Sequence, residues 1–388
     1  MDVHDRNFQI LKPFVSSNIN DQDLQQIIAK TFAFPSVLKA INDTNYCLEL
    51  FHGPTLAFKD FGANFMANCL TTFAKTKQHE KTAESKPITI LTATSGDTGA
   101  AVAHAFYGLE NIQVVILFPK GKISELQQKM FTTLGGNIHT IAIDGSFDDC
   151  QQLVKQSFDQ TELVQSIGLN SANSINISRL LAQVCYYFDA FAQLPSDKRD
   201  QLVISVPSGN FGNLCAGIIA KILGLPIKRF IASTNINDTV PRYLQTGEWS
   251  PKETIATMSN AMDVSKPNNW PRIEYMMHSE QFDPMALSGV GVNEMQTQES
   301  LKSLHQQGYI SEPHAAVAYY GLQQSLKTGE TGLFLGTAHP AKFKSTVEEI
   351  LAIELPLPKE LAHCAIKADL SHELAADFKQ LEEFLYRL

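Results

Sequence analysis

The stretch His52-Gly53-Pro54-Thr55-Leu56-Ala57-Phe58-Lys59-Asp60-Phe61-Gly62 places one lysine between two phenylalanines, just after a glycine–proline turn. Apolar residues then recur at helical spacing, which predicts a helix that begins near Lys59 and buries one face. These residues are Phe61, Phe65, Met66, Cys69, Leu70 and Phe73. Burial and the positive end of a helix dipole both disfavour an ammonium ion, so the Lys59 amine should lose its proton readily. A neutral amine is what a Schiff base requires, whereas an ordinary lysine keeps its charge in solvent.

The composition is that of an ordinary globular chain, with 388 residues of which 44% are hydrophobic and 18% charged. This length predicts two or three domains. A formal net charge of −9 argues against non-specific binding to nucleic acid, so an anionic ligand needs a local site. We find no secretory signal and no apolar run long enough to cross a membrane. The six cysteines form no CxxC pair, which indicates reduced thiols in a cytoplasmic enzyme and no zinc site.

Strand and helix patterns alternate through much of the chain, which predicts parallel sheets covered by helices on both faces. The first 45 residues are polar and helical, with Asn20 or Asp21 as an N-cap. Residues 235–300 have a less regular pattern. We expect strands at 46–51, 88–91, 114–118, 138–143, 202–206, 227–232 and 332–336, and helices at 99–107, 123–134, 147–158, 179–192 and 214–223.

Two polar loops connect an expected strand to an expected helix. One is Thr94–Gly99 and the other Ser208–Asn213, and both contain glycines and small polar residues. Such a loop presents backbone N–H groups at a helix N-terminus, which is a good site for an anion. Each loop could equally be a simple turn between a strand and a helix.

A third polar segment precedes the helix expected at 179–192. Asn173 and Ser174 come before it, and Arg179 occupies its first turn. A cation at that end of a helix is unfavourable unless an anion lies nearby, and the planar guanidinium suits a phosphate. The alternative is a surface arginine paired with a carboxylate such as Asp189.

The string HGPTLAFKDFG resembles the cofactor-lysine motif of threonine synthases, which are pyridoxal phosphate (PLP) enzymes of fold type II. The similarity continues in the family's order through TATSGDTGAAVAHAF, LGGNI, NSANSINISRLLAQ, SVPSGNFGN, NAMDV, PNNWPR, EPHAAVAY and LGTAHPAKF. The resemblance implies a two-domain α/β fold like that of the tryptophan synthase β subunit, with parallel-rich sheets flanked by helices and an active site in the interdomain cleft. We expect residues 56–172 to form the small domain, and 1–55 with 173–388 the large one. The N-terminal segment is short relative to the family.

The resemblance also assigns roles to individual residues. Lys59 would carry PLP, Thr337 would face the pyridine nitrogen, and Asp97 stands where many relatives have an asparagine near the phenolic oxygen. The phosphate of PLP would be held by Gly209, Asn210, Phe211, Gly212 and Asn213. The substrate carboxylate would be held by Thr94, Ser95, Gly96 and Thr98, and the substrate phosphate by Asn173, Ser174 and Arg179. His339 and Lys342 either support a phosphate or are structural, Trp249 and Trp270 are structural, and no metal is implied.

The implied reaction converts O-phospho-L-homoserine and water to L-threonine and phosphate, by γ-elimination and β-addition of water. Lys59 would serve as the acid–base group. A serine/threonine dehydratase or a phospholyase would keep Lys59 and the loop at 208–213 without needing Asn173, Ser174 and Arg179. A non-catalytic metabolite-binding relative would be expected to lose Lys59. No nucleic-acid or membrane partner is implied, and a monomer and a homodimer both remain open.

Overall fold

The chain folds into two compact units, which we describe one at a time. The computed structural model describes residues 1–79, 88–173 and 176–388. The first unit comprises Met1–Phe14, Phe34–Phe58 and Leu180–Pro356, and the second comprises Val15–Ala33, Lys59–Arg179 and Leu357–Leu388. Neither unit is one continuous stretch of chain, so each depends on contacts between segments far apart in sequence.

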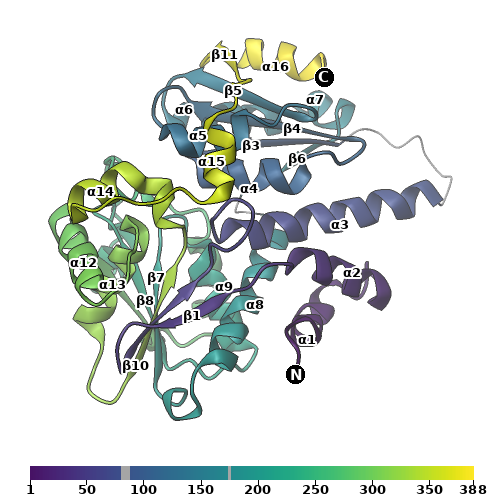
Figure 1. The fold of residues 1–388 in the computed structure, drawn as a ribbon. Helices are drawn as coiled ribbons and strands as arrows, with labels where there is room; N and C mark the ends of the chain where they lie inside the picture. The colour runs from purple at the N-terminus through teal and green to yellow at the C-terminus, as the bar shows by residue number, and fades with distance from the viewer. Residues whose placement is uncertain (80–87, 174–175) are drawn as a thin grey trace. The chain divides into compact units, whose positions relative to one another are not determined.

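The first unit is built on a six-stranded sheet in the order β1-β2-β10-β7-β8-β9 (Figure 1). All neighbouring strands run parallel except the pair β1 and β2. Every residue of β2, β7 and β10 is buried, as expected for parallel strands that are covered on both faces. The strands are β1 Val37–Ala40, β2 Asn45–Glu49, β7 Leu202–Pro207, β8 Arg229–Thr234, β9 Leu287–Gly291 and β10 Thr331–Gly336.

Helix α13 (Pro313–Ser325) packs on the middle of this sheet. Its residues Ala318 and Leu322 share a buried cluster with Val203 of β7, Ile231 of β8 and Phe334 of β10. The other helices of this unit are α1 Val3–Val15, α8 Ile177–Gln193, α9 Gly212–Ile222, α10 Thr239–Thr246, α11 Trp270–His278, α12 Glu294–Gln306 and α14 Lys344–Leu351.

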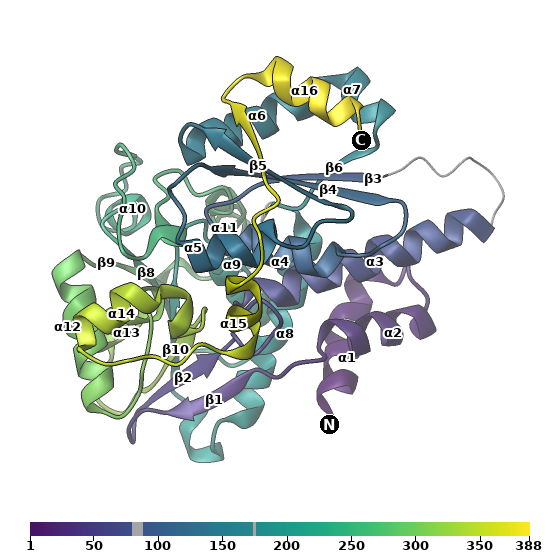
Figure 2. The ribbon, with the colours of Figure 1, turned by 45° about the horizontal axis from the view of Figure 1, so that its top comes forward.

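The second unit contains a five-stranded sheet in the order β11-β5-β4-β3-β6, in which all neighbours are parallel (Figure 2). Its strands are β3 Ile88–Ala93, β4 Ile112–Pro119, β5 Ile138–Asp144, β6 Leu169–Ser171 and β11 His372–Ala375. Its helices are α2 Asp21–Thr31, α3 Lys59–His79, α4 Asp97–Phe106, α5 Glu125–Thr132, α6 Phe147–Asp159, α7 Thr161–Ser166, α15 Lys359–Ala365 and α16 Phe378–Tyr386.

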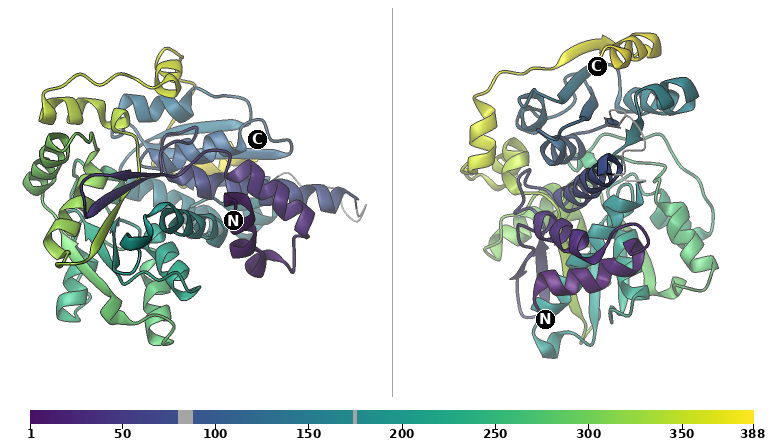
Figure 3. Two further views of the ribbon diagram at one scale, coloured as in Figure 1. Left: turned by 60° about the horizontal axis from the view of Figure 1, so that its bottom comes forward. Right: turned by 90° about the vertical axis from the view of Figure 1, so that its right-hand side faces the viewer.

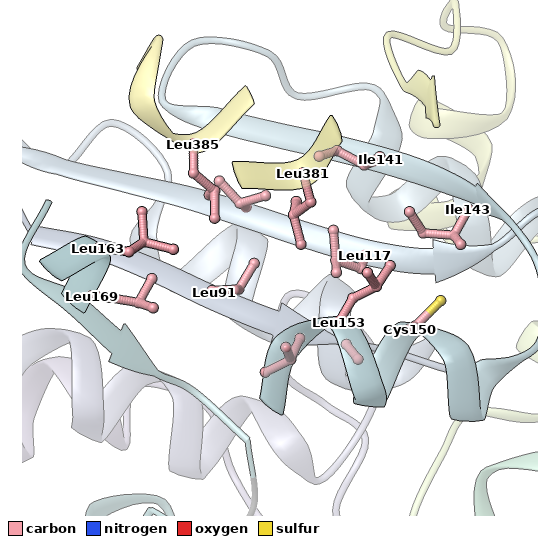
Figure 4. Close-up of a cluster of buried hydrophobic side chains, with 13 residues drawn as sticks. Leu91, Leu117, Ile141, Ile143, Cys150, Leu153, Leu163, Leu169, Leu381 and Leu385 are labelled. Carbon is pink, nitrogen blue, oxygen red and sulfur yellow. The ribbon is translucent and has the colours of Figure 1, made fainter. Parts of the chain in front are cut away.

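Alternate residues of β3, β4 and β5 form the core on one face of this second sheet (Figure 4). Leu91, Leu117 and Ile141 point to that face because side chains along a strand alternate with a period of two. Leu153 of α6 and Leu381 of α16 cover them, and both leucines are fully buried. Two helices from distant parts of the chain therefore close one hydrophobic layer.

The end of the chain belongs to the second unit, whereas the sequence assigned it to the large domain. Residues 372–375 form β11, which pairs with Ile141–Asp144 of β5, and α16 then packs beside α6. Figure 3 shows this segment in yellow along the blue strands. The pairing gives the edge of β5 its backbone hydrogen bonds, a long-range effect that no local pattern near residue 372 reveals.

The strands and helices predicted from residue 46 onward are confirmed apart from small shifts of their ends. The helical prediction for the first 45 residues is wrong in part, because Val37–Ala40 form strand β1, which pairs with β2. Asn20 is the N-cap of α2, and its Oδ1 accepts the Asp23 N–H at 2.9 Å. The prediction of irregular structure at residues 235–300 is wrong in part, because this range contains helices α10 and α11 and strand β9. The Pro and Asn residues there mark the connections between these elements.

Within the described ranges no helix is long and apolar enough to cross a membrane, and no group of three His, Cys, Asp or Glu side chains could hold a metal ion. All six cysteines are described and buried, and none of them forms a disulfide.

We expect Leu381→Ala to weaken the second unit, because it opens a cavity between α16 and the sheet. A buried leucine truncated in this way costs about 2–5 kcal/mol. The free energy of opening, measured by hydrogen exchange of the β5 amides, should fall by that amount. Tyr386→Ala is the matched control, since Tyr386 is 49% exposed on the same helix. Equal effects of both substitutions would contradict the packing described here.

Candidate active site

Each sheet has one place where the strand order reverses. In the first unit the chain runs from β7 to β8 to β9 on one side, and β10 lies on the other side of β7. In the second unit it runs from β3 to β4 to β5 on one side, and β6 lies on the other side of β3. Ligands of open parallel sheets bind beyond the carboxyl ends of the strands at such a point. The segments that follow β7, β10, β3 and β6 are therefore the candidates, and they contain most of the residues predicted from sequence.

Lys59 is the first residue of α3, as predicted. It is half-buried, while Phe61, Phe65 and Met66 behind it are buried. The preceding residue, Phe58, donates its N–H to the carbonyl oxygen of Thr337 at 2.9 Å. This bond fixes the backbone one residue before the lysine at the segment that follows β10.

The loop after β3 is organised by the hydroxyl of Thr94. Its Oγ1 accepts the N–H groups of Gly96 and Gly99 at 3.0 and 2.8 Å and donates to the Gly96 carbonyl at 3.1 Å. One hydroxyl offers one proton and two lone pairs, so these three bonds use its full capacity. Thr94 therefore holds the shape of the loop, while Ser95 and Thr98 are half-buried on it.

Asp97 begins α4 and is buried beside this loop. Its Oδ1 accepts a hydrogen bond from Gln127 Nε2 at 3.2 Å. Gly96 before it has φ of 138°, and a Cβ there would lie 3.1 Å from the same Gln127 nitrogen. Gln127 of α5 thus fixes the first turn of α4, a role that we did not predict from sequence.

Asn173 and Arg179 lie after β6, at the same end of the sheet as the Thr94 loop. The side-chain Oδ1 of Asn173 accepts a hydrogen bond from Thr92, two residues before Thr94. Arg179 Nη1 donates to the Ala172 carbonyl at 2.6 Å, so its guanidinium is directed back toward the start of α8. Ser174, the third predicted phosphate ligand, lies outside the described residues.

Arg179 is only 2% exposed, and its burial lowers the pKa of the guanidinium to about 10. Asp189, the alternative partner for a surface arginine, instead accepts hydrogen bonds from Arg6 and Ser36. The surface-arginine alternative is therefore wrong. The backbone of Arg179 also abuts α3, because a Cβ on Gly62 would lie 2.5 Å from its carbonyl oxygen. The helix that Lys59 begins and the helix that holds Arg179 meet at this glycine.

In the first unit, the loop after β7, residues 208–213, packs closely against residues 262–270. A Cβ on Gly209 would lie 2.5 Å from Met262 Cα, so only glycine fits there without a shift of the backbone. The carbonyl of Asn210 accepts the Asn269 side chain at 3.0 Å. Phe211 has a left-handed backbone, φ 62°, and its ring packs edge-on to Trp270 at 5.7 Å. The structural role predicted for Trp270 is borne out by this contact.

Asn213 lies in the first turn of α9, and its side-chain amide nitrogen Nδ2 is a potential hydrogen-bond donor at the loop. Its Oδ1 accepts the hydroxyls of Tyr186 and Tyr187 at 2.6 and 2.8 Å. These two bonds orient the amide, and its buried Nδ2 has no hydrogen-bond partner among the described residues. A buried donor without a partner is costly, so the arrangement suits an acceptor bound at the N-terminus of α9.

The segment after β10 holds the lysine motif in place. The His339 N–H donates to the Leu56 carbonyl at 3.0 Å, and Lys342 Nζ donates to the Thr55 carbonyl at 2.7 Å. His339 Nδ1 also accepts the Ala341 N–H at 3.1 Å. These contacts favour the structural alternative for His339 and Lys342. Thr337 is buried at the end of β10.

The comparisons with known proteins cover the whole of this architecture. A family model described as pyridoxal-phosphate dependent enzyme matches residues 35–342, and one described as threonine synthase, C-terminal, matches residues 315–385. Threonine synthase of Escherichia coli (strain K12) is 59% identical over 385 residues, which cover 99% of this chain and 88% of that relative.

The chain belongs to the threonine synthase family. The family predicted from the motifs is thus confirmed, with PLP as its cofactor and a PLP-dependent lyase as its class of enzyme. The crystal structure of the Escherichia coli enzyme has a TM-score of 0.94 and covers 100% of this chain and 88% of its own. A PLP-bound threonine synthase from Brucella melitensis, 31% identical, has a TM-score of 0.90 and covers the same shares of the two chains, 100% and 88%.

The residues at the β7 loop fit a PLP phosphate. Gly209 lets the loop lie directly against the backbone of Met262, Asn213 Nδ2 has no hydrogen-bond partner among the described residues, and α9 begins at Gly212, where an anion is favoured. The sequence did not reveal the surroundings that hold this loop. Those residues lie in the strings NAMDV, PNNWPR and EPHAAVAY, in which the fold buries the polar side chains of Asn269, Glu312 and His314.

We expect Thr94→Val to loosen the loop after β3, because it removes the hydroxyl but keeps the shape of the side chain. Each backbone group left without a partner costs about 1–3 kcal/mol, so the Gly96 and Gly99 amides should exchange with solvent roughly ten-fold faster or more. Hydrogen exchange of these two amides is the measurement. Thr94→Ser should retain slow exchange, and unchanged exchange in Thr94→Val would contradict the role of the hydroxyl.

Proposed function

We propose that the substrate is O-phospho-L-homoserine and that the products are L-threonine and phosphate. The observation that carries this is the pair of anion-binding arrangements, one after β3 and β6 and the other after β7. Two phosphate groups are present in the proposed reaction, and a buried donor lies in the first turn of α8, at Arg179, and in that of α9, at Asn213. The overall conversion consumes one water, as phosphate leaves the γ carbon and a hydroxyl is added at the β carbon.

Asn173 and Arg179 are proposed to bind the substrate phosphate, together with Ser174. The buried guanidinium lies at the positive end of α8, where a bound anion would be favoured by both the charge and the helix dipole. Ser95, Gly96 and Thr98 are proposed to bind the substrate carboxylate at the first turn of α4, in the loop that Thr94 holds. A dehydratase acting on an unphosphorylated amino acid would not need the buried arginine.

Gly209, Asn210, Phe211, Gly212 and Asn213 are proposed to hold the cofactor phosphate. Bound PLP supplies an electron sink for the carbanions that form beside the substrate nitrogen. Thr337 is proposed to face the pyridine nitrogen and Asp97 the phenolic oxygen. A hydroxyl at Thr337 offers a hydrogen bond without the negative charge that would keep the nitrogen protonated.

Lys59 is proposed to hold the cofactor covalently at rest and to move protons during turnover. Its position at the start of α3 favours the neutral amine, and a neutral amine can both attach to a carbonyl and accept a proton. The non-catalytic alternative would not need this lysine. The six buried cysteines form no disulfide, which is in keeping with a cytoplasmic location, and we also propose that location.

Lys59→Ala should abolish product formation and the covalent label left by borohydride reduction, because no other group replaces its amine. The test incubates the purified protein with O-phospho-L-homoserine and measures released phosphate and threonine, which should appear in equal amounts in the unchanged protein. Lys155→Ala, which removes an exposed lysine of α6, is the control. Full turnover by Lys59→Ala, or a product other than threonine, would overturn the proposed function.

Arg179→Ala should lower turnover of O-phospho-L-homoserine at limiting concentration by roughly ten- to a hundred-fold. This corresponds to about 1.5–3 kcal/mol for a charge-assisted hydrogen bond. The visible absorbance of bound PLP should be nearly unchanged, and any side activity on serine or threonine should fall much less. Arg179→Lys should rescue poorly, because an ammonium lacks the planar fork. Equal losses on phosphorylated and unphosphorylated substrates would indicate a structural role and support the dehydratase alternative.

A further inference from the structure

A short backbone turn, Ser259–Asp263, lies directly behind the loop that follows β7. Its bonds run from the Met262 N–H to the Ser259 carbonyl at 2.8 Å and from the Asp263 N–H to the Asn260 carbonyl at 3.1 Å. A Cβ on Gly209 would lie 2.5 Å from Met262 Cα and 3.1 Å from the Ala261 carbonyl oxygen. The loop and the turn are therefore in backbone contact, so a displacement of the turn displaces the loop.

His314 of α13, a helix that packs on the sheet, forms a hydrogen bond with the backbone of this turn. Its Nε2 accepts the Ala261 N–H at 3.2 Å. An accepting Nε2 requires the proton on Nδ1, and Nδ1 faces Glu312 Oε2 at 2.6 Å. The ring is also packed against Phe343 with centroids 5.0 Å apart. The histidine is thus fixed in both tautomer and orientation.

Glu312 is itself fixed at the start of α13. Its Oε1 accepts the Ala315 N–H at 2.9 Å, and its Oε2 accepts the His314 N–H at 2.7 Å. Both side chains are deeply buried, with 1% of Glu312 and 4% of His314 exposed. A continuous set of hydrogen bonds therefore runs from the helix terminus through the imidazole to the backbone of the turn.

The opposite end of the turn is anchored by Asp263. Its Oδ1 accepts hydrogen bonds from Asn235 Nδ2 at 2.9 Å and Thr257 Oγ1 at 2.7 Å. Asn235 follows β8, the strand next to β7. Hydrogen bonds to Asn235 and to His314 therefore hold the turn at two points, and the His314 bond is made to Ala261, whose carbonyl oxygen faces Gly209.

We propose that His314, oriented by Glu312, is a positioning residue for the cofactor phosphate. By holding Ala261 it keeps the turn against Gly209, and so keeps the N–H groups of the loop and Asn213 Nδ2 at the spacing that a phosphate requires. The inference rests on the proposed assignment of this loop to the phosphate of PLP. A histidine that served only to stabilise the core would affect all ligands of the protein alike.

The test compares the affinities of the apoprotein for PLP and for pyridoxal, which lacks the phosphate, by absorbance titration. Because the two ligands differ only in the phosphate, the ratio of their dissociation constants measures the contribution of the phosphate to binding. His314→Leu should weaken PLP binding by roughly ten-fold, as expected for one lost hydrogen bond to a buried backbone donor, and leave pyridoxal binding unchanged. The ³¹P resonance of bound PLP should shift as well.

His314→Gln places an amide oxygen where Nε2 accepts and should restore most of the phosphate selectivity. His139→Leu is the matched control, since it removes a ring hydrogen bond to Gln113 in the second unit. If His314→Leu does not fold, His314→Asn makes the same comparison with a side chain too short to reach Ala261.

The outcomes distinguish failure of the positioning role of His314 from failure of the proposal that the loop after β7 binds the phosphate. If Gly209→Ala lowers the PLP-to-pyridoxal selectivity and His314→Leu does not, or if His314→Leu weakens both ligands equally, the positioning role is overturned. If Gly209→Ala binds PLP with unchanged selectivity, the loop does not hold the phosphate, and the proposed function of the loop fails before the role of His314 is reached.

Discussion

The parallel arrangement of the strands is the constraint on which the rest of the structure depends. Parallel neighbours need crossover connections, so each strand that leads to a parallel neighbour is followed by a loop and a helix start. Where the strand order reverses, the loops that follow two adjacent strands turn to opposite faces of the sheet. The space between these two loops can hold a ligand. This happens between β7 and β10 in one unit and between β3 and β6 in the other. The positions of Thr94, Asn173, Asn213 and Thr337 follow from this topology.

The sequence predicted those parts of the site in which local chemistry and local structure coincide. Lys59 opens a helix because apolar residues recur behind it, and the Ser208–Asn213 loop opens α9 because its glycines permit a close backbone approach. The alternation of strands and helices was equally readable, since buried parallel strands are continuous apolar runs. Thr94 shows the limit of this reasoning. The family resemblance implied that Thr94 contacts the substrate carboxylate, whereas the structure shows that its hydroxyl bonds to the loop's own backbone.

What the sequence did not reveal depends on contacts between distant segments. The turn behind Gly209 comes from residues about fifty positions later, and His314 and Glu312 come from a further helix. Asp263, Asn235 and Thr257 likewise form hydrogen bonds between segments that are separate in the sequence. Burial raises the pKa of the Asp263 carboxyl to about 6, while hydrogen bonds from Thr257 and Asn235 act in the other direction. The hydrogen bonds of Asp263 to Thr257 and Asn235 rigidify the turn, yet no local pattern distinguishes these residues from surface polar ones.

The pairing of β11 with β5 has a consequence for how the protein is made. Residues 372–386 supply both an edge strand and Leu381 and Leu385 of the second core. A ribosome synthesises them long after β3, β4 and β5 have emerged. Until then the edge of β5 is open and the core beneath α16 is uncovered, which is a template for wrong pairing with other chains. The nascent second unit therefore stays exposed to aggregation until residues 372–386 have emerged, and a chaperone that shields strand edges would protect it during that interval.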